Sequence, residues 1–224
     1  MSTINLPVVA GRLTSDRLSS YLSAVHGDLR RAMALYDWNT AVGGALHEDV
    51  GRFEVVLRNT IDQALVTHGD THAWGTVWYS RTSLFAGKRG RRAIDDIRTA
   101  RFRIARRNAA ETHGRMIAEL SFGFWRYLCS ASYLTSLWVP VLTAAFPNHP
   151  RAGDPRAVRG DVEDRVQRIH FLRNRIAHHE PIHQRDLASD YRAILEVTGW
   201  ICADTRRWLA TTSRTHTVLP RRPS

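Results

Sequence analysis

The residues with the greatest capacity for chemistry lie between Leu172 and His183, in the stretch LRNRIAHHEPIH. Two arginines, an asparagine, three histidines and a glutamate occur within these twelve residues. Arginine binds phosphate oxygens in pairs, and histidine exchanges protons near neutral pH, so the set suits a site that binds or cleaves a phosphodiester. The alternative is the solvated, basic end of a helix with no chemical role.

A helix is predicted from Arg156 to about His179, and it would position these groups. Its apolar residues recur three or four positions apart: Val162, Val166, Ile169, Leu172 and Ile176. Asn174 and His178 are four apart and therefore share a face of the helix. Arg173 and His178 are five apart, roughly 140° around the axis. To share a pocket with His178, Arg173 must therefore use the full length of its side chain, or the pocket must be shared with a second chain.

The helix should end near its two histidines, because Pro181 disfavours helical geometry at the residue before it. Free carbonyls at a helix C-terminus favour a cation, which helps a histidine there to keep its proton. A histidine at this helix end, His178 or His179, is thus suited to acid–base work on a phosphodiester, and an arginine beside it would neutralise charge in the transition state. RNA supplies its own nucleophile in the 2′-hydroxyl. We expect no cofactor and no metal, since His178 and His179 diverge by about 100° on the helix.

Three separated motifs resemble one known family. The R-N-x-x-x-H pattern at 173–178 is similar to the Rx4–6H signature of HEPN domains (higher eukaryotes and prokaryotes nucleotide-binding). More narrowly, LRNRIAHH resembles the Abi-like branch, named for abortive phage infection. That branch pairs this helix with an upstream E-x-x-L-R-N helix and an SFGFW segment. Here FEVVLRNTI spans 53–61 and LSFGFWRYL spans 120–128, so the matches cover roughly residues 14–205 in the expected order.

The resemblance implies an all-α, HEPN-type helical bundle with additional helices, usually a homodimer whose Arg/His motifs line one shared cleft. It implies a metal-independent endoribonuclease of antiphage or toxin-like defence, which leaves 2′,3′-cyclic phosphate ends and has an antitoxin protein as a candidate partner. The catalytic residues carried over are Arg173, Asn174 and His178. Two alternatives stay open: a non-catalytic module that binds RNA or a nucleotide, and a structural protein whose motif seals a dimer.

Four further residues are candidates for supporting this site. His179 and Arg175 are four apart, so they could form a structural pair or assist the chemistry directly. Glu54 and Arg58 are also four apart, and their neighbours in the sequence are apolar. A partly buried ion pair is retained for specificity or function more readily than for stability. We therefore hypothesise that Glu54 orients a residue of the Arg/His motif.

The charge of the chain points to a polyanionic partner. Its formal net charge is +11, and Lys88 is the only lysine among its 32 basic residues. Arginine grips phosphate oxygens in pairs, so nucleic acid is the expected partner class. The predicted basic helix at 91–108 supplies three candidate contacts to the RNA backbone, Arg98, Arg101 and Arg106. A solvated face balanced by nearby aspartates is the alternative for this helix.

The rest of the sequence predicts helices, because apolar residues recur at helical spacing and few runs alternate as strands do. The expected helices span about 14–27, 28–69, 91–108, 114–134, 135–146, 156–179 and 186–210. We expect one all-helical domain over 1–224, with its core at about 14–210 and a flexible tail at 211–224. Hydrophobic residues make up 43% of the chain, which is ample for such a core. The pair Gly43-Gly44 should mark a bend or a close helix contact.

The sequence also favours a cytoplasmic protein with no membrane contact. Its first residues lack a basic start followed by an apolar run of signal-peptide length. The twenty residues Tyr127–Phe146 carry no formal charge and approach the length that spans a bilayer. Hydroxyl side chains and Pro140 interrupt them, so a buried helix is expected. Cys129 and Cys202 fit no zinc pattern and are expected to be buried thiols in a reducing compartment.

Overall fold

A computed structural model describes residues 4–72, 75, 77–85 and 90–223. All regular structure in these residues is helical, which confirms the predicted all-α class. The α-helices are α1 (Leu6–Leu13), α2 (Ser15–Ala24), α3 (Leu29–Thr71), α4 (Arg91–Arg106), α5 (His113–Glu119), α6 (Phe122–Leu128), α7 (Pro155–Ala177), α8 (Leu187–Ile201), α9 (Ala203–Thr212) and α10 (Thr215–Val218). Short 3-10 segments lie at Trp78–Ser80, Thr82–Phe85, Ala131–Tyr133, Leu142–Ala145 and Leu219–Arg221, and Leu134–Trp138 is a π-helical turn.

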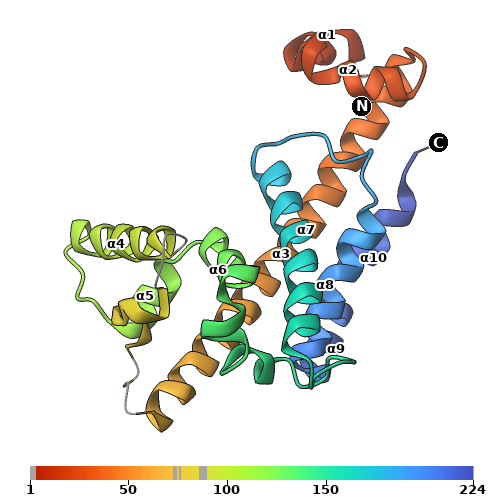
Figure 1. The fold of residues 1–224 in the computed structure, drawn as a ribbon. Helices are drawn as coiled ribbons and strands as arrows, with labels where there is room; N and C mark the ends of the chain where they lie inside the picture. Colours follow the sequence, from red (N-terminus) through yellow and green to blue (C-terminus); the bar gives the residue numbers. More distant parts are fainter. Residues whose placement is uncertain (1–3, 73–74, 76, 86–89, 224) are drawn as a thin grey trace.

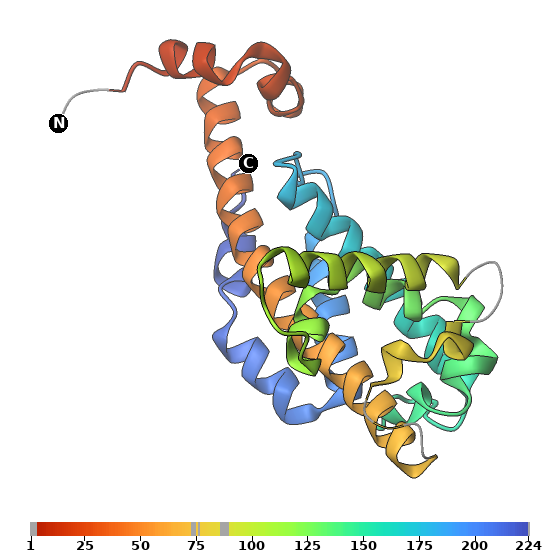
Figure 2. The same ribbon diagram turned by 90° about the vertical axis from the view of Figure 1, so that its left-hand side faces the viewer.

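The long helix α3 is the element around which the others are arranged. It contains 43 residues, about 65 Å at 1.5 Å per residue. Figures 1 and 2 show it running the length of the molecule, with α1 and α2 at one end and α7 and α8 alongside its middle. Asp28 closes its first turn as predicted, because its Oδ1 accepts the Arg31 N–H at 3.0 Å. The helix continues through both glycines. An added Cβ at Gly43 would lie 3.7 Å from Ile182 Cδ1, so Gly43 is in ordinary van der Waals contact with the loop after α7, whereas a Cβ at Gly44 would meet nothing within 4 Å.

The N-terminal region contains one helix more than the sequence predicted. Helix α2 begins after Thr14, whose Oγ1 accepts the Arg17 N–H at 3.4 Å, and Gly27 follows it with φ +85°. The additional helix α1 is capped by Asn5, whose Oδ1 accepts the Val8 N–H at 3.3 Å. None of its residues is fully buried, although Leu6 and neighbouring side chains pack against the core. The fully buried core begins at Leu18, and α1 adds only partly buried contacts before residue 14.

The aromatic region at 113–146 is divided more finely than expected. The predicted helix 114–134 is interrupted before α6, where the Ser121 Oγ accepts the Phe124 N–H at 3.3 Å and caps the new helix. Trp125 and Trp138 are fully buried, so the cluster forms core as predicted. Burial also raises the pKa of the Cys129 thiol to about 12. Within the described ranges, no helix has both the length and the apolar composition needed to span a bilayer.

The C-terminal half differs from prediction at two places. The expected helix 186–210 is divided at Cys202, whose extended backbone separates α8 from α9, and this cysteine is half-buried rather than buried. The expected flexible tail at 211–224 is wrong for its described part, because the chain packs against α3. The buried carboxylate of Asp49 accepts hydrogen bonds from Ser213 Oγ at 2.6 Å and Thr215 Oγ1 at 2.7 Å. Trp38 Nε1 also donates to the Val218 carbonyl at 3.0 Å.

This attachment predicts that Asp49 is a strong determinant of stability. In Asp49→Ala, two buried hydroxyls and Arg52 lose their acceptor, so we expect the free energy of unfolding to fall by roughly 2–4 kcal/mol. Asp37→Ala, an exposed aspartate of the same helix, should cost less than about 0.5 kcal/mol. Urea denaturation of both variants measures the difference. Equal losses would show that the C-terminal segment does not depend on Asp49.

Candidate functional site

The Arg/His stretch occupies the C-terminal end of α7, which Figure 1 shows beside α3 and pointing toward α1 and α2. Arg173 and Asn174 are half-buried in the last two turns of the helix. His178 is the residue that caps the helix end, and its side chain is exposed. The structure therefore places Arg173 and Asn174 near the protein interior and His178 at the surface, about 7.5 Å farther along the axis than Arg173 at 1.5 Å per residue.

The helix ends where the sequence predicted, through a specific hydrogen-bonded turn. The His179 N–H donates to the Ile176 carbonyl at 3.0 Å, and the Glu180 N–H donates to the Arg175 carbonyl at 2.8 Å. This is the Schellman arrangement, which requires a left-handed residue just after the cap. His179 supplies it with φ +55°. Glycine is the usual residue there, so a histidine at this position carries a conformational cost.

Arg175 serves the turn rather than the site. Its Nη2 donates to the Pro181 carbonyl at 2.8 Å, and its Nη1 lies 3.2 Å from Glu180 Oε2. The expected pairing of Arg175 with His179 is therefore replaced by contacts to the loop that follows the helix. Arg175 fixes the path of that loop, which is a structural role.

Glu54 lies within electrostatic reach of Arg173. Burial raises the pKa of the Glu54 carboxyl, and the positive charges of Arg173 and Arg58 oppose this, with Arg173 acting more strongly. His47, two turns earlier on α3, contributes to the same field. No hydrogen bond or ion pair joins Glu54 to Arg173 among the described residues, so their interaction acts through the electrostatic field. That Glu54 orients a residue of the Arg/His motif stays a prediction.

His170 is a member of the site that the sequence analysis missed. Its Nδ1 lies 3.5 Å from Asn174 Nδ2, and its ring lies 5.5 Å from the Phe122 ring, centroid to centroid. A Cβ added to Gly123 would lie 3.7 Å from His170 Nε2. Burial lowers the pKa of His170, and the charges of Arg126 and Arg173 lower it further. His170 is therefore held neutral between the SFGFW segment and Asn174.

We refer to Glu54, Arg58, His170, Arg173 and Asn174 as the Arg173 cluster. It gathers side chains from α3 and α7 beside the first turn of α6. The Asn174 side chain contacts His170 in the preceding turn. Its backbone carbonyl accepts the His178 N–H at 3.0 Å, and no hydrogen bond joins the side chains of Asn174 and His178 in the described structure. The signal that could have revealed His170 is its spacing, three residues before Arg173 and four before Asn174.

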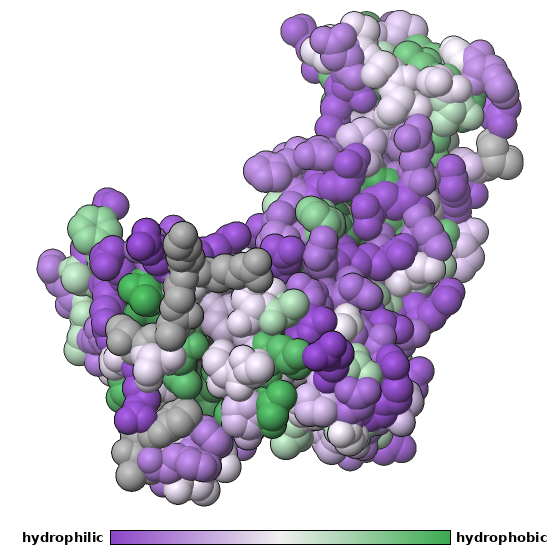
Figure 3. Space-filling model, viewed as in Figure 1, coloured by the Kyte–Doolittle hydropathy of each residue, from purple (hydrophilic) through white to green (hydrophobic). Residues whose placement is uncertain are grey.

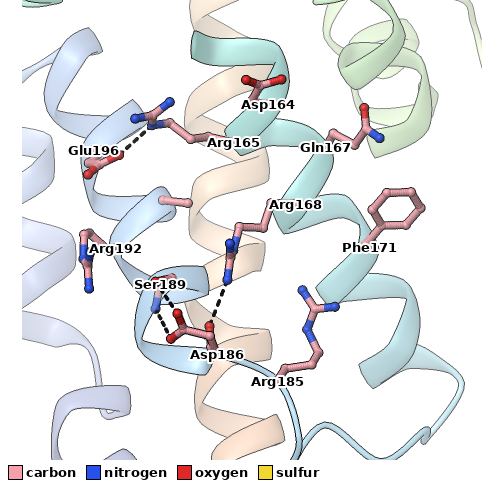
Figure 4. A pocket seen from close by; sticks show the side chains of 11 residues that line it. Asp164, Arg165, Gln167, Arg168, Phe171, Arg185, Asp186, Ser189, Arg192 and Glu196 are labelled. Atoms are coloured by element: carbon pink, nitrogen blue, oxygen red, sulfur yellow. Dashed lines mark hydrogen bonds and ion pairs between the residues drawn. The ribbon is translucent and has the colours of Figure 1, made fainter.

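A groove of about 700 Å³ lies on a different face of the helix, between α7 and α8 (Figure 4). Four arginines line this groove, but three of them form ion pairs with carboxylates. Arg168 and Arg185 lie 2.6 Å and 3.0 Å from the fully buried Asp190, and Arg165 lies 2.6 Å from Glu196. These ion pairs neutralise most of the positive charge, so the groove is a weak candidate for binding a polyanion.

The predicted RNA-binding residues of α4 have three different environments. Arg101 is engaged within the protein, since its Nη2 donates to Ser80 Oγ at 2.8 Å and its Nε lies 3.3 Å from Glu111 Oε1. Arg98 is exposed and pairs with Asp95 at 3.0 Å. Arg106 is exposed, with its guanidinium 5.9 Å from the Phe102 ring centroid. Arg98 and Arg106 remain accessible, and Arg101 has mainly a structural role.

The surface around the end of α7 is mostly hydrophilic, as the purple area between the upper and lower parts of Figure 3 shows. In the part of the chain that the structure describes, no three histidine, cysteine or acidic side chains are grouped to hold a metal ion. Comparison of the chain with protein-family models, curated proteins and solved structures gave no match. The functional argument therefore rests on the residues and their geometry.

The turn at the end of α7 predicts opposite effects of glycine at its two histidines. His179→Gly relieves a left-handed strain, so the free energy of unfolding should stay constant or rise by up to about 1 kcal/mol. His178→Gly, at φ −93°, offers no such relief and should lower it by roughly 0.5–1 kcal/mol. Thermal and urea denaturation measure both values. Strong destabilisation by His179→Gly would contradict the assigned role of the turn.

The environment of Glu54 predicts a pH-dependent effect of its removal. A carboxyl with a raised pKa in the folded state stabilises the fold at low pH, and this contribution is lost as the pH rises through the folded pKa. Glu54→Gln removes the titrating carboxyl, so the variant does not lose this stabilisation as the pH rises. The free energy of unfolding, variant minus wild type, should therefore increase between roughly pH 4 and pH 7.

Glu48 on the same helix provides a control of opposite sign. A hydrogen bond from Arg214 lowers the pKa of Glu48, so its carboxylate stabilises the fold above the unfolded pKa. For Glu48→Gln the same difference should decrease over this pH range. Urea denaturation at several pH values checks both slopes. A decrease for Glu54→Gln as well would mean that attraction to Arg173 outweighs burial.

Proposed function

We propose that this protein is a metal-independent endoribonuclease of the HEPN type, from the Abi-like group, that acts in cytoplasmic antiphage or toxin-like defence. The observation that carries the proposal is the Arg173 cluster with the exposed His178 one turn beyond it. Phosphate is the ligand that a half-buried arginine and an adjacent amide bind well. A histidine at a helix end, accessible to solvent, suits proton transfer to and from that phosphate.

In the proposed reaction, the 2′-hydroxyl of one nucleotide attacks the adjacent phosphorus and the bond from phosphorus to the 5′-oxygen breaks. The products are a 2′,3′-cyclic phosphate and a 5′-hydroxyl. Arg173 and Asn174 hold the phosphate, and Arg173 neutralises the charge that grows on its oxygens. His178 either takes the 2′-hydroxyl proton or protonates the departing 5′-oxygen. Glu54 and neutral His170 orient Arg173 and Asn174 and do not touch the reacting atoms.

A second copy of the chain would complete the site, because His178 and Arg173 diverge on one helix. The exposed face of α7 suits such a homodimer. Phe171 on this face is 52% exposed, and His178 follows it by seven residues, which places both side chains on the same side of the helix. Packing of this face against its copy would cover Phe171 and bring the partner's His178 toward the Arg173 cluster. The accessible arginines of α4, Arg98 and Arg106, would contact the RNA backbone, and an antitoxin would bind over the cleft.

The cleavage of RNA in excess chelator tests the proposal. Wild-type protein should produce cyclic-phosphate ends, which resist alkaline phosphatase and become open to ligation or tailing only after acid hydrolysis of the cyclic ester followed by phosphatase. His178→Ala should reduce the rate about 10²–10⁴-fold, and Arg173→Ala about 10²–10³-fold. Arg156→Ala is the matched control, since this exposed arginine lies on the first turn of the same helix and should leave the rate unchanged.

Other outcomes assign other functions. RNA binding without cleavage, weakened by salt and by Arg173→Ala, would identify a non-catalytic RNA-binding or nucleotide-binding module. If RNA is neither bound nor cut, and light scattering shows a dimer that is lost in the Arg173 and His178 variants, the motif has only a structural role. Either result would overturn the proposed endoribonuclease.

A further inference from the structure

A second groove begins at the end of α7, on the side that faces α2 and α3. Its volume is about 390 Å³, which is within the range of small-molecule sites. Side chains of Arg17, Tyr36, Asn39 and His47 line one side, and His179 and Glu180 line the other. We call this space the His179 groove. It adjoins the residue next to His178 but contains no member of the Arg173 cluster.

Asn39 presents unused hydrogen-bond donors in this groove. Its side chain is only 6% exposed, and its Oδ1 accepts the Ile182 backbone N–H at 2.8 Å. That acceptor role fixes the orientation of the amide, so Nδ2 must carry the two N–H groups. Nδ2 donates to no described residue, although Asn39 lines the groove. Nδ2 is not one of the fully enclosed polar atoms without a partner among the described residues, so its N–H groups are open to water or to a ligand in the groove.

The walls of the groove favour a flat ligand. The Arg17 guanidinium lies 5.8 Å from the centroid of the Tyr36 ring, so aromatic and guanidinium surfaces are adjacent. The α3 side of the groove contains Gly43 and Gly44, and a Cβ added to Gly44 would meet nothing within 4 Å. The absence of side chains at these positions keeps the groove open. Planar bases stack on aromatic rings and arginine planes while their edges form hydrogen bonds.

We propose that the His179 groove binds one nucleobase of the RNA substrate, through an acceptor on the base edge that pairs with Asn39 Nδ2. The Glu180 carboxylate, on the opposite wall, can accept from an amino or imino group of the same base. Because the groove adjoins His179, a base bound there places its own phosphate next to His178 and the Arg173 cluster. The inference rests on the proposed function in naming RNA, and it adds a subsite that gives the cleavage base selectivity.

Filling the groove is the direct test. Gly44→Leu introduces a side chain where space is open, without removing a contact. Gly160→Leu on α7 is the matched control, because an added Cβ there also meets nothing within 4 Å and the residue lies outside both grooves. Circular dichroism and thermal melts establish that both variants fold. Adenosine, guanosine, cytidine and uridine serve as probes, since nucleosides lack the phosphate that the Arg173 cluster would bind.

At least one nucleoside should bind to the wild type and to Gly160→Leu, measured by nuclear magnetic resonance titration. Binding should weaken at least about 10-fold in Gly44→Leu. Asn39→Asp keeps an acceptor for the Ile182 N–H and removes the donors, so it should weaken binding of the preferred nucleoside by a similar factor. If no nucleoside binds, or if Gly44→Leu binds as well as Gly160→Leu, the subsite does not exist.

The titration separates this inference from the proposed function. Nucleoside binding that depends on Gly44, in a protein that cuts no RNA, supports the groove and rejects the endoribonuclease. RNA cleavage with equal KM and equal base preference in Gly44→Leu and Gly160→Leu supports the endoribonuclease and rejects the groove. When both hold, Gly44→Leu should raise KM or lose the base preference.

Discussion

The hydrogen bond from the Ile182 backbone N–H to Asn39 Oδ1 is the interaction on which the arrangement of the site depends. It ties the loop after α7 to the middle of α3, 143 residues earlier in the chain. Ile182 is buried beside Gly43, where an added Cβ would lie in ordinary van der Waals contact with Ile182 Cδ1 at 3.7 Å. The Schellman turn at His179 and the Arg175 contacts to Pro181 and Glu180 hold the same loop from the α7 side. The buried amide of Asn39 therefore fixes the far end of the loop that begins at the two histidines.

Electrostatics distinguishes the Arg173 cluster from the other arginines near α7. Buried or half-buried carboxylates neutralise Arg165, Arg168 and Arg185 at short distances, so the larger groove is a structural ion-pair network. The carboxyl near Arg173 belongs to Glu54, whose pKa is raised rather than lowered. No described carboxylate lies within ion-pair distance of Arg173, whereas Asp190 and Glu196 lie 2.6 Å from Arg168 and Arg165 respectively. Arg173 keeps more of its capacity to attract a phosphate, which is the property that the proposed function requires.

Local signals in the sequence were sufficient for the elements that end at a proline or begin at a cap. Pro181 marked the end of α7, and Asp28 marked the start of α3, because both act within one helical turn. Glu54 was found through its i,i+4 relation to Arg58 and its apolar neighbours. The HEPN-type arrangement and its chemistry remain proposals, since motif spacing alone does not fix how helices pack.

Features that depend on contacts between distant parts of the chain could not be predicted from residue spacing within one helix. His170 belongs to the site because α6 brings Gly123 against it, and that contact joins positions 47 residues apart. The C-terminal segment looked polar and unstructured because its buried groups are hydroxyls, and their acceptor, Asp49, lies more than 160 residues away. Gly43-Gly44 indicated a contact without naming its partner, which for Gly43 is Ile182. In each case the missing information was which distant element covers the residue.

The hydrogen bond between Asn39 and Ile182, which holds the loop that begins at the two histidines, also borders the His179 groove. With its Oδ1 committed to Ile182, Asn39 must direct its N–H groups away from the loop and toward the His179 groove. Gly43 admits the loop, and Gly44, one residue on, leaves the adjoining volume open. The loop position and the shape of the groove beside it therefore meet at one contact between α3 and the chain after α7. A substrate held there would meet the reacting groups and the selective groups on a single rigid frame, which is the requirement for cutting RNA at chosen bases.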